Sequence, residues 1–170
     1  MLSLIIGGAG SGKSAFAETL CQRLSGERLY IATMHTEGAE SLARIERHRR
    51  QRAGLGFETL ECPLSLDKAA IPAGANALLE DLSNLLANEM FSHGGGGAEA
   101  VRRGLCQALS RCENLTVVTN EVFSGGADYG AGTLAFLREL AALNRELAAR
   151  ADLVAEIVCG LPNVLKGELP

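Results

Sequence analysis

The stretch that decides the fold is Gly7-Gly8-Ala9-Gly10-Ser11-Gly12-Lys13-Ser14, which matches the pattern G-x-x-x-x-G-K-[S/T]. Glycines allow backbone N–H groups to turn inward around phosphate oxygens without a Cβ in the way. A lysine at this position reaches the β- and γ-phosphates, and the hydroxyl of the next residue can ligate magnesium. The pattern therefore predicts a phosphate-binding loop (P-loop) for a nucleoside triphosphate carried with Mg²⁺, in which Lys13 supplies catalytic charge and Ser14 is a metal ligand.

The residues on either side of the P-loop have the pattern that its chemistry needs. Leu2 to Ile6 is a short apolar run, which is typical of a buried parallel strand. From Ser14 onward, apolar residues recur with helical spacing as far as a stop at Gly26. A helix that begins beside Ser14 directs the positive end of its dipole toward the phosphates. This order of strand, loop and helix favours a phosphate site over a glycine-rich turn with no ligand.

Apolar runs and helical periodicity alternate along the rest of the chain. Further strands are predicted at 29–33, 57–61, 77–79, 115–119 and 153–158. Helices are predicted at 40–52, from 82 to about 90, from the end of the glycine run to residue 112, and at 133–150. The glycine run itself, Gly94 to Gly97, is predicted to be a flexible loop. This alternation predicts a single α/β domain over residues 1–170, with a mainly parallel sheet flanked by helices.

Composition excludes several classes of protein. A hydrophobic content of 47% over 170 residues is too high for a disordered chain, and a net charge of −4 argues against nucleic-acid binding. No apolar run is long enough to cross a membrane and no secretory leader begins the chain, so a cytoplasmic location is expected. The cysteines are odd in number and contain no C-x-x-C pair, so free thiols are predicted at Cys21, Cys62, Cys106, Cys112 and Cys159.

Three carboxylates are candidates for holding magnesium. Enzymes with a P-loop usually place such a group at the end of a neighbouring strand. Glu80 and Asp81 follow one predicted strand, and Glu121 follows another. An acid in either place can equally be a helix N-cap or a first-turn residue, so the sequence leaves the choice among the three open.

His48 lies within the basic segment Arg44 to Arg52. A lone histidine among helical arginines is usually part of a solvated face. The functional alternative is that neighbouring positive charges disfavour imidazolium and keep His48 neutral and nucleophilic, while they attract polyphosphate. Such a histidine could attack the α-phosphate of a nucleoside triphosphate and carry the nucleotide covalently.

Taken in order, several segments resemble the bifunctional adenosylcobinamide kinase/adenosylcobinamide-phosphate guanylyltransferase family. The resemblance covers essentially the whole chain, and the R-I-x-x-H-R helix between YIAT and TNEV is much more specific than the P-loop alone. The segments are GGAGSGKS at 7–14, YIAT at 30–33, RIERHRRQR at 44–52, Glu61, LLED at 78–81, VTNEV at 118–122, NRELAARAD at 144–152 and GLPNVLKG at 160–167.

The resemblance implies a three-layer, RecA-like P-loop NTPase fold, a homotrimer and two successive reactions. ATP or GTP phosphorylates adenosylcobinamide. GMP then passes from GTP to adenosylcobinamide phosphate through a guanylyl-histidine at His48, which gives adenosyl-GDP-cobinamide and pyrophosphate. The resemblance also implies nucleotide contacts at Gly7, Gly8, Ala9, Gly10, Ser11, Gly12, Lys13, Ser14, Ala32, Thr33, Met34, Arg49, Arg50, Gln51, Arg52, Glu61 and Glu80.

The chain departs from the family pattern at two places, and two other functions stay open. Many members have an arginine at the position of Gly10, and many have a Gly-Pro segment with an arginine where this chain has residues 123–129. One alternative is a P-loop kinase of another small alcohol, with His48 a surface residue. The other is a nucleotide-binding regulatory module without turnover.

Overall fold

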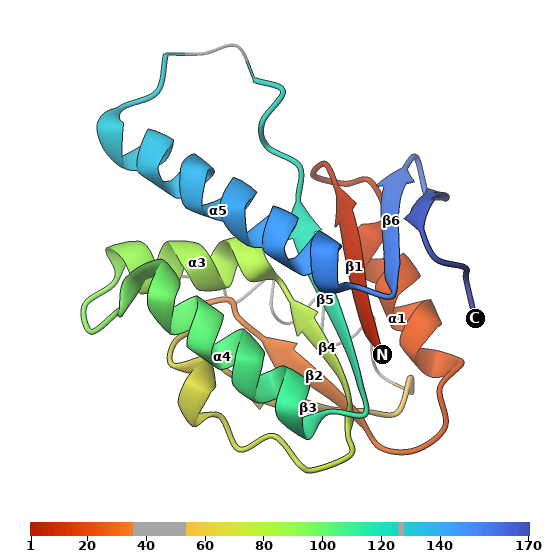
Figure 1. Ribbon diagram of the computed structural model, residues 1–170. Coiled ribbons are helices and arrows are strands. Elements are labelled where there is room, and N and C mark those ends of the chain that lie inside the picture. Colours follow the sequence, from red (N-terminus) through yellow and green to blue (C-terminus); the bar gives the residue numbers. More distant parts are fainter. Residues whose placement is uncertain (36–53, 126–127) are drawn as a thin grey trace.

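A seven-stranded sheet forms the centre of the computed structural model, which describes residues 1–35, 54–125 and 128–170 (Figure 1). The strand order is β3-β2-β4-β5-β1-β6-β7. All neighbours pair in parallel except β6 and β7, which form an antiparallel hairpin. The strands are β1 (Leu2–Gly7), β2 (Arg28–Ala32), β3 (Phe57–Glu61), β4 (Asn76–Glu80), β5 (Asn114–Asn120), β6 (Leu153–Val158) and β7 (Leu161–Lys166).

Helices cover both faces of the sheet, which makes three layers. Helix α1 (Lys13–Gln22) packs on one face, and α3 (Leu82–Phe91), α4 (Gly97–Arg111) and α5 (Ala131–Arg150) pack on the other (Figure 1). A 3₁₀ turn, η1 (Leu66–Lys68), packs against α4. The predicted RecA-like P-loop fold with a mainly parallel sheet is confirmed.

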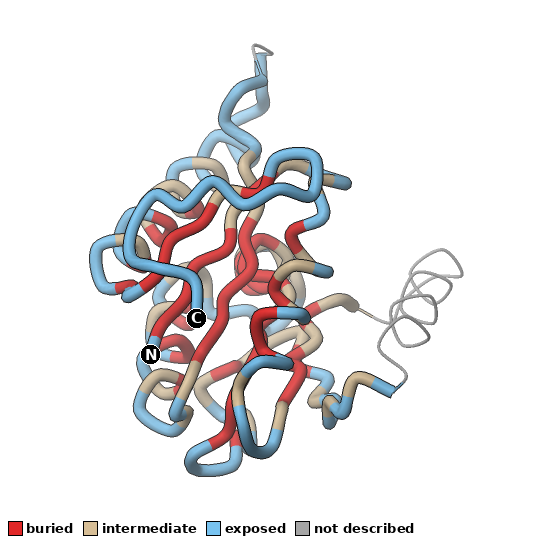
Figure 2. The backbone as a smooth tube through the Cα atoms, turned by 90° about the vertical axis from the view of Figure 1, so that its right-hand side faces the viewer, coloured by how far each residue is buried: buried red, intermediate tan, exposed pale blue. Residues whose placement is uncertain are grey.

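Two apolar clusters lie between these layers. The cluster under α1 contains Ile5, Ala17 and Leu20, and the larger one under α3, α4 and α5 contains Leu86 and Leu140. Buried residues follow strands β1 to β6 apart from the more exposed β3, and exposed residues follow the outer loops and β7 (Figure 2). Because the inner strands are buried on both faces, their sequences are continuous apolar runs rather than alternating ones.

All six strands predicted from the apolar runs are present, with ends that differ by at most one residue. The predicted helix at 40–52 lies outside the described residues. Strand β7 was not predicted. All six of its residues are exposed and it contains Pro162, so it has neither an apolar run nor an alternation, as is usual for an edge strand.

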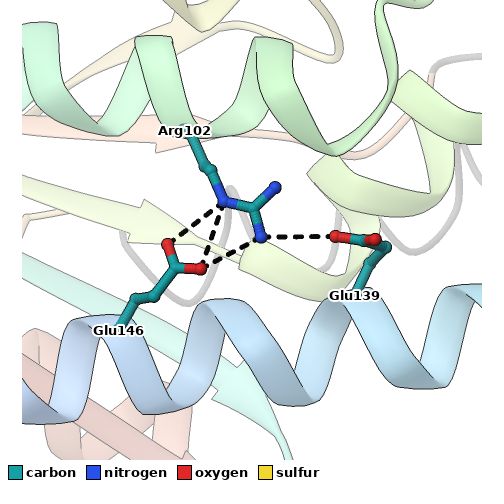
Figure 3. A network of polar contacts seen from close by, with 3 residues as sticks. All are labelled: Arg102, Glu139 and Glu146. Carbon is teal, nitrogen blue, oxygen red and sulfur yellow. Dashed lines mark hydrogen bonds and ion pairs between the residues drawn. The ribbon is translucent and has the colours of Figure 1, made fainter.

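An arginine links α4 to α5 on the surface (Figure 3). Arg102 donates to both oxygens of Glu146 at 3.0–3.2 Å and to Glu139 at 3.3 Å. The two carboxylate side chains are 40–51% exposed, so water screens the pairs and each contributes less than about 1 kcal/mol. The contacts therefore add little to the stability of two helices that the apolar core already holds on the sheet.

The glycine run forms a tight turn between α3 and α4 around a buried carboxylate. The Glu89 side chain is 3% exposed. Its two oxygens accept the N–H of Ser65 at 2.6 Å and of Gly96 at 2.7 Å. A Cβ at Gly95 would overlap the Glu89 carbonyl oxygen. The run was predicted to be a flexible loop, but Glu89 fixes part of its backbone.

All five cysteines lie in the described ranges, and each is a free thiol. Burial raises the pKa of Cys62 and of Cys112 to about 11, so both are protonated at neutral pH. Among the described residues, no helix combines the length and the apolar character needed to cross a bilayer.

Candidate nucleotide and magnesium site

The P-loop leaves β1 at Gly7 and enters α1 at Lys13, as its sequence predicts. The loop turns back on itself, because the N–H of Ser11 donates to the Gly8 carbonyl at 3.2 Å. Gly7 has no room for a side chain, since a Cβ there would lie 2.6 Å from Ser11 Oγ. Gly12, at φ +92°, has the left-handed conformation that begins α1 and that favours glycine.

Lys13 is held within its own loop. Its side chain is 7% exposed, and Nζ donates to the Gly8 carbonyl at 3.1 Å. Within the described parts of the chain, no carboxylate lies within ion-pair distance of this ammonium. The positive charge is therefore held at the loop, and no described carboxylate pairs with it directly, which leaves it available to a polyphosphate.

Parallel pairing brings distant parts of the chain to the same edge of the sheet. Ala32 pairs with Glu80 of β4 on one side and with Glu61 of β3 on the other. Gly7 pairs with Asn120 of β5. All five residues are at the carboxyl ends of their strands, where open α/β sheets bind their ligands.

Thr33 fixes the junction between β2 and β4. It is fully buried, and its hydroxyl lies within 2.8–3.0 Å of the Glu80 carbonyl and of both the carbonyl and the N–H of Asp81. The peptide bond between Glu80 and Asp81 is cis. Thr33 therefore contributes by holding Glu80 in place, because its hydroxyl is already engaged with the backbone.

Glu80 is the candidate carboxylate that contacts the P-loop. The hydroxyl of Ser14 donates to its Oε1 at 2.7 Å. Its Oε2 is buried and has no hydrogen-bond partner among the described residues. Burial, together with repulsion from Asp81, raises the pKa of Glu80 to about 7, although the Ser14 hydrogen bond and the Lys13 charge oppose the rise. A hydroxyl beside an unpartnered carboxylate oxygen suits Mg²⁺, which prefers hard oxygen ligands.

The other two candidate carboxylates make different contacts. Asp81 caps α3, because its Oδ1 accepts the N–H of Asn84 at 2.7 Å. Glu121 closes its own turn, since its oxygens accept the Phe123 N–H at 3.0 Å and the Ser124 hydroxyl at 3.1 Å. Of the three, only Glu80 forms a hydrogen bond with Ser14 within the described ranges.

The remaining predicted site residues divide into two groups. Met34 is half-buried just after β2, and Glu61 is exposed at the end of β3. His48 and the neighbouring Arg49, Arg50, Gln51 and Arg52 lie outside the described residues.

Two groups at this edge were not among the predicted site residues. The amide of Asn120 donates to the Ser83 hydroxyl at 2.6 Å and to Asp81 at 3.3 Å. Gly160, from the β6–β7 turn, donates its N–H to the Ser11 carbonyl at 2.8 Å. Both lie in segments that carry the family resemblance, VTNEV and GLPNVLKG, which was the available signal.

A parallel sheet whose first strand leads through a phosphate loop into a helix, with a carboxylate beside the loop serine, defines a P-loop nucleotide-binding enzyme. Comparison with known families gives the particular one. Residues 3–165 match the model of the cobinamide kinase / cobinamide phosphate guanyltransferase family. The chain belongs to this family, and it is accordingly a transferase of cobalamin biosynthesis.

Three relatives support the assignment. The chain is 33% identical to the bifunctional adenosylcobalamin biosynthesis protein CobP of Pseudomonas aeruginosa, with 99% of both chains covered. It is also 33% identical to the bifunctional adenosylcobalamin biosynthesis protein CobU of Escherichia coli and to that of Salmonella typhimurium, with 95% of this chain and 97% of each relative covered.

Proposed function

We propose that residues 1–170 act as one domain that catalyses two successive transfers. ATP or GTP phosphorylates the hydroxyl of adenosylcobinamide, and GMP is then transferred from GTP to adenosylcobinamide phosphate. The observation that carries this proposal is the contact between Ser14 and Glu80 beside a buried Lys13, in a chain of this family.

The phosphoryl transfer uses the P-loop. Backbone N–H groups and Lys13 hold the β- and γ-phosphates. The substrate hydroxyl oxygen attacks the γ-phosphorus and gives up its proton to water, the bond to the bridging oxygen breaks, and the nucleoside diphosphate leaves with the electron pair. Ser14 and Glu80 would hold Mg²⁺, which when bound supplies charge that neutralises the phosphate oxygens. Lys13 stabilises the charge on the transferring group.

The guanylyl transfer uses His48 as the nucleophile. A ring nitrogen of neutral His48 attacks the α-phosphorus of GTP, a P–N bond forms, and pyrophosphate leaves. A phosphate oxygen of adenosylcobinamide phosphate then attacks the same phosphorus and breaks the P–N bond, which restores the imidazole. We propose nucleotide contacts at Ala32, Met34, residues 49–52 and Glu61, because these positions match the family motif. Thr33 also matches the motif, and we propose that it acts there by holding Glu80, because it is fully buried and its hydroxyl is engaged with the backbone.

We also propose that the protein is a cytoplasmic homotrimer whose partners are its small-molecule substrates. The support is the resemblance of the whole chain to the family. Light scattering on the purified protein measures the mass directly. The mass of a monomer or a dimer would contradict the trimer.

Incubation with α-labelled GTP tests the function. The label should become attached to the protein through a bond that is labile in acid and persists in base, as expected for a phosphoramidate. Peptide mapping should place GMP on His48, and His35→Ala is the matched control that should retain the adduct. Kinase activity on a corrinoid without any adduct would favour the kinase alternative, and an adduct on His35 or His93 would contradict the role of His48.

A further inference from the structure

The turn between β6 and β7 lies directly against the P-loop. Cys159 at φ +51° and Gly160 at φ +80° form this two-residue turn. The N–H of Gly160 donates to the carbonyl of Ser11 at 2.8 Å. The two backbones approach closely, since a Cβ on Gly12 would lie 3.1 Å from the Gly160 Cα. The hairpin thus contacts the centre of the phosphate loop through main-chain atoms.

This contact determines the orientation of one peptide group of the loop. The Ser11 carbonyl and the Gly12 N–H belong to the same peptide unit. In a trans peptide the C=O and the N–H point in opposite directions. Because the carbonyl is directed at Gly160, the Gly12 N–H is directed away from the hairpin. A P-loop binds phosphate with inward-pointing N–H groups of this kind.

We propose that the Gly160 N–H is a positioning group for the P-loop, which holds the Ser11–Gly12 peptide so that the Gly12 N–H faces the triphosphate. The inference rests on the proposed function, in which a triphosphate occupies the loop. Gly160 does not touch the nucleotide in this proposal. It acts through Ser11.

The rest of the hairpin keeps the turn in place. All six residues of β7 are exposed, so the strand adds little to the apolar core. It is nevertheless held at its far end, where Lys166 Nζ donates to the carbonyls of Ala148 and Ala149 at 3.2 and 3.0 Å, in the last turn of α5. On the β6 side, the Ile157 carbonyl lies 2.8 Å from where a Cβ on Gly7 would be. Support of the P-loop gives this exposed strand a function that core packing does not.

Chemical ligation can remove the single N–H. Cys159 allows a thioester of residues 1–158 to be joined to a synthetic peptide of residues 159–170, in which glycolic acid replaces Gly160. The backbone is then an ester at this point and the donor is lost. The all-amide ligation product is the reference, and an ester at exposed Leu169 is the control for the chemistry. Loss of one hydrogen bond should weaken the binding of Mg²⁺-GTP about tenfold. Binding of guanosine, which lacks phosphates, should not change.

Gly160→Ala separates positioning from stability. This variant keeps the N–H, and its Cβ enters open space, but φ +80° strains any L-residue. Its melting temperature should fall while its affinity for Mg²⁺-GTP stays within about twofold of the wild type, since the donor to Ser11 remains. If the ester binds Mg²⁺-GTP as tightly as the amide, or if Gly160→Ala loses as much affinity as the ester, the inference is wrong. An all-amide product that binds no triphosphate would instead overturn the proposed function, and this inference with it.

Hydrogen exchange in the unmodified protein gives a second test that does not depend on refolding a ligated chain. Coupling between two sites is reciprocal, so a triphosphate that depends on the Gly160 hydrogen bond must also strengthen that bond. Exchange of the Gly160 amide should slow about tenfold with saturating Mg²⁺-GTP and should not slow with guanosine. If the Gly160 amide exchanges at the same rate in the free protein, with Mg²⁺-GTP and with guanosine, the inference is overturned.

Discussion

Replacing Glu80 with glutamine should make the nucleotide-free protein more stable at neutral pH than the wild type. Glu80→Gln keeps the shape of the side chain and removes its ionisable group. In the folded protein the pKa of Glu80 rises from the ordinary 4.5 to about 7, chiefly because the carboxyl is buried. The folded chain therefore binds this proton more tightly than the unfolded chain does. The charged form carries a cost that the variant does not have.

The size and the sign of the effect follow from that pKa. A tenfold change in proton affinity corresponds to about 1.4 kcal/mol, so the rise from 4.5 to about 7 corresponds to roughly 3 kcal/mol. Below pH 4.5 the carboxyl is protonated in both states and carries no charge cost. As pH rises from 4.5 through 7, the wild type loses stability relative to Glu80→Gln, and above this window the difference is constant.

Urea unfolding of both proteins between pH 4.5 and 8, in EDTA and without nucleotide, measures this difference. Glu121→Gln removes another carboxylate from the same edge of the sheet and serves as the control. In a Ser14→Ala background the pH dependence should steepen, because the Ser14 hydroxyl stabilises the ionised form of Glu80. A difference that does not change with pH, or that favours the wild type as pH rises, would refute the reasoning.

Four further results are expected. Lys13→Ala should lower both transfer rates about a hundredfold or more, because the charge on the polyphosphate is lost, and wild-type turnover by a folded variant would contradict the P-loop assignment. His48→Ala should abolish the GMP adduct seen by mass spectrometry and retain much of the kinase activity, whereas an adduct that persists would show that another residue is the nucleophile. Asp81→Ala should lower the free energy of unfolding by about 1–2 kcal/mol through loss of the α3 cap. In the same urea titration, Asp81→Asn should keep most of the wild-type free energy of unfolding, because asparagine can also cap a helix. Arg102→Ala removes both ion pairs and should cost less than about 2 kcal/mol, with a loss that shrinks in high salt; a larger, salt-independent loss would contradict the small contribution assigned to these pairs.

The sequence was sufficient for the fold because the sheet is nearly all parallel. Strands such as β1 and β5 are buried on both faces, so they are recognisable in the sequence as apolar runs. The P-loop was equally clear, because its spacing is set by phosphate chemistry. Strand β7 has neither signal, since an exposed edge strand needs no apolar side chains.

The choice of carboxylate could not be predicted, because it depends on where neighbouring side chains point. Glu80 and Asp81 are adjacent in the chain, yet one contacts Ser14 and the other caps α3. Thr33 fixes both through backbone contacts that have no local sequence pattern. The contact of Gly160 with Ser11 is also between main-chain atoms. Such a contact selects no particular side chain, so the sequence shows only a glycine at this position. The role of His48 stays a prediction.

The turn around Glu89 has a consequence for protein engineering. Four consecutive glycines between two helices look like a natural place to insert a fluorescent reporter or an epitope. In this chain an insertion beside Gly96 would take its N–H away from Glu89 and leave a buried negative charge with one of its two backbone donors missing, at a cost of about 1.5–3 kcal/mol. A reporter inserted there would lower the stability of the fold without touching the catalytic residues. A loss of activity would then reflect unfolding and could be mistaken for a defect in catalysis.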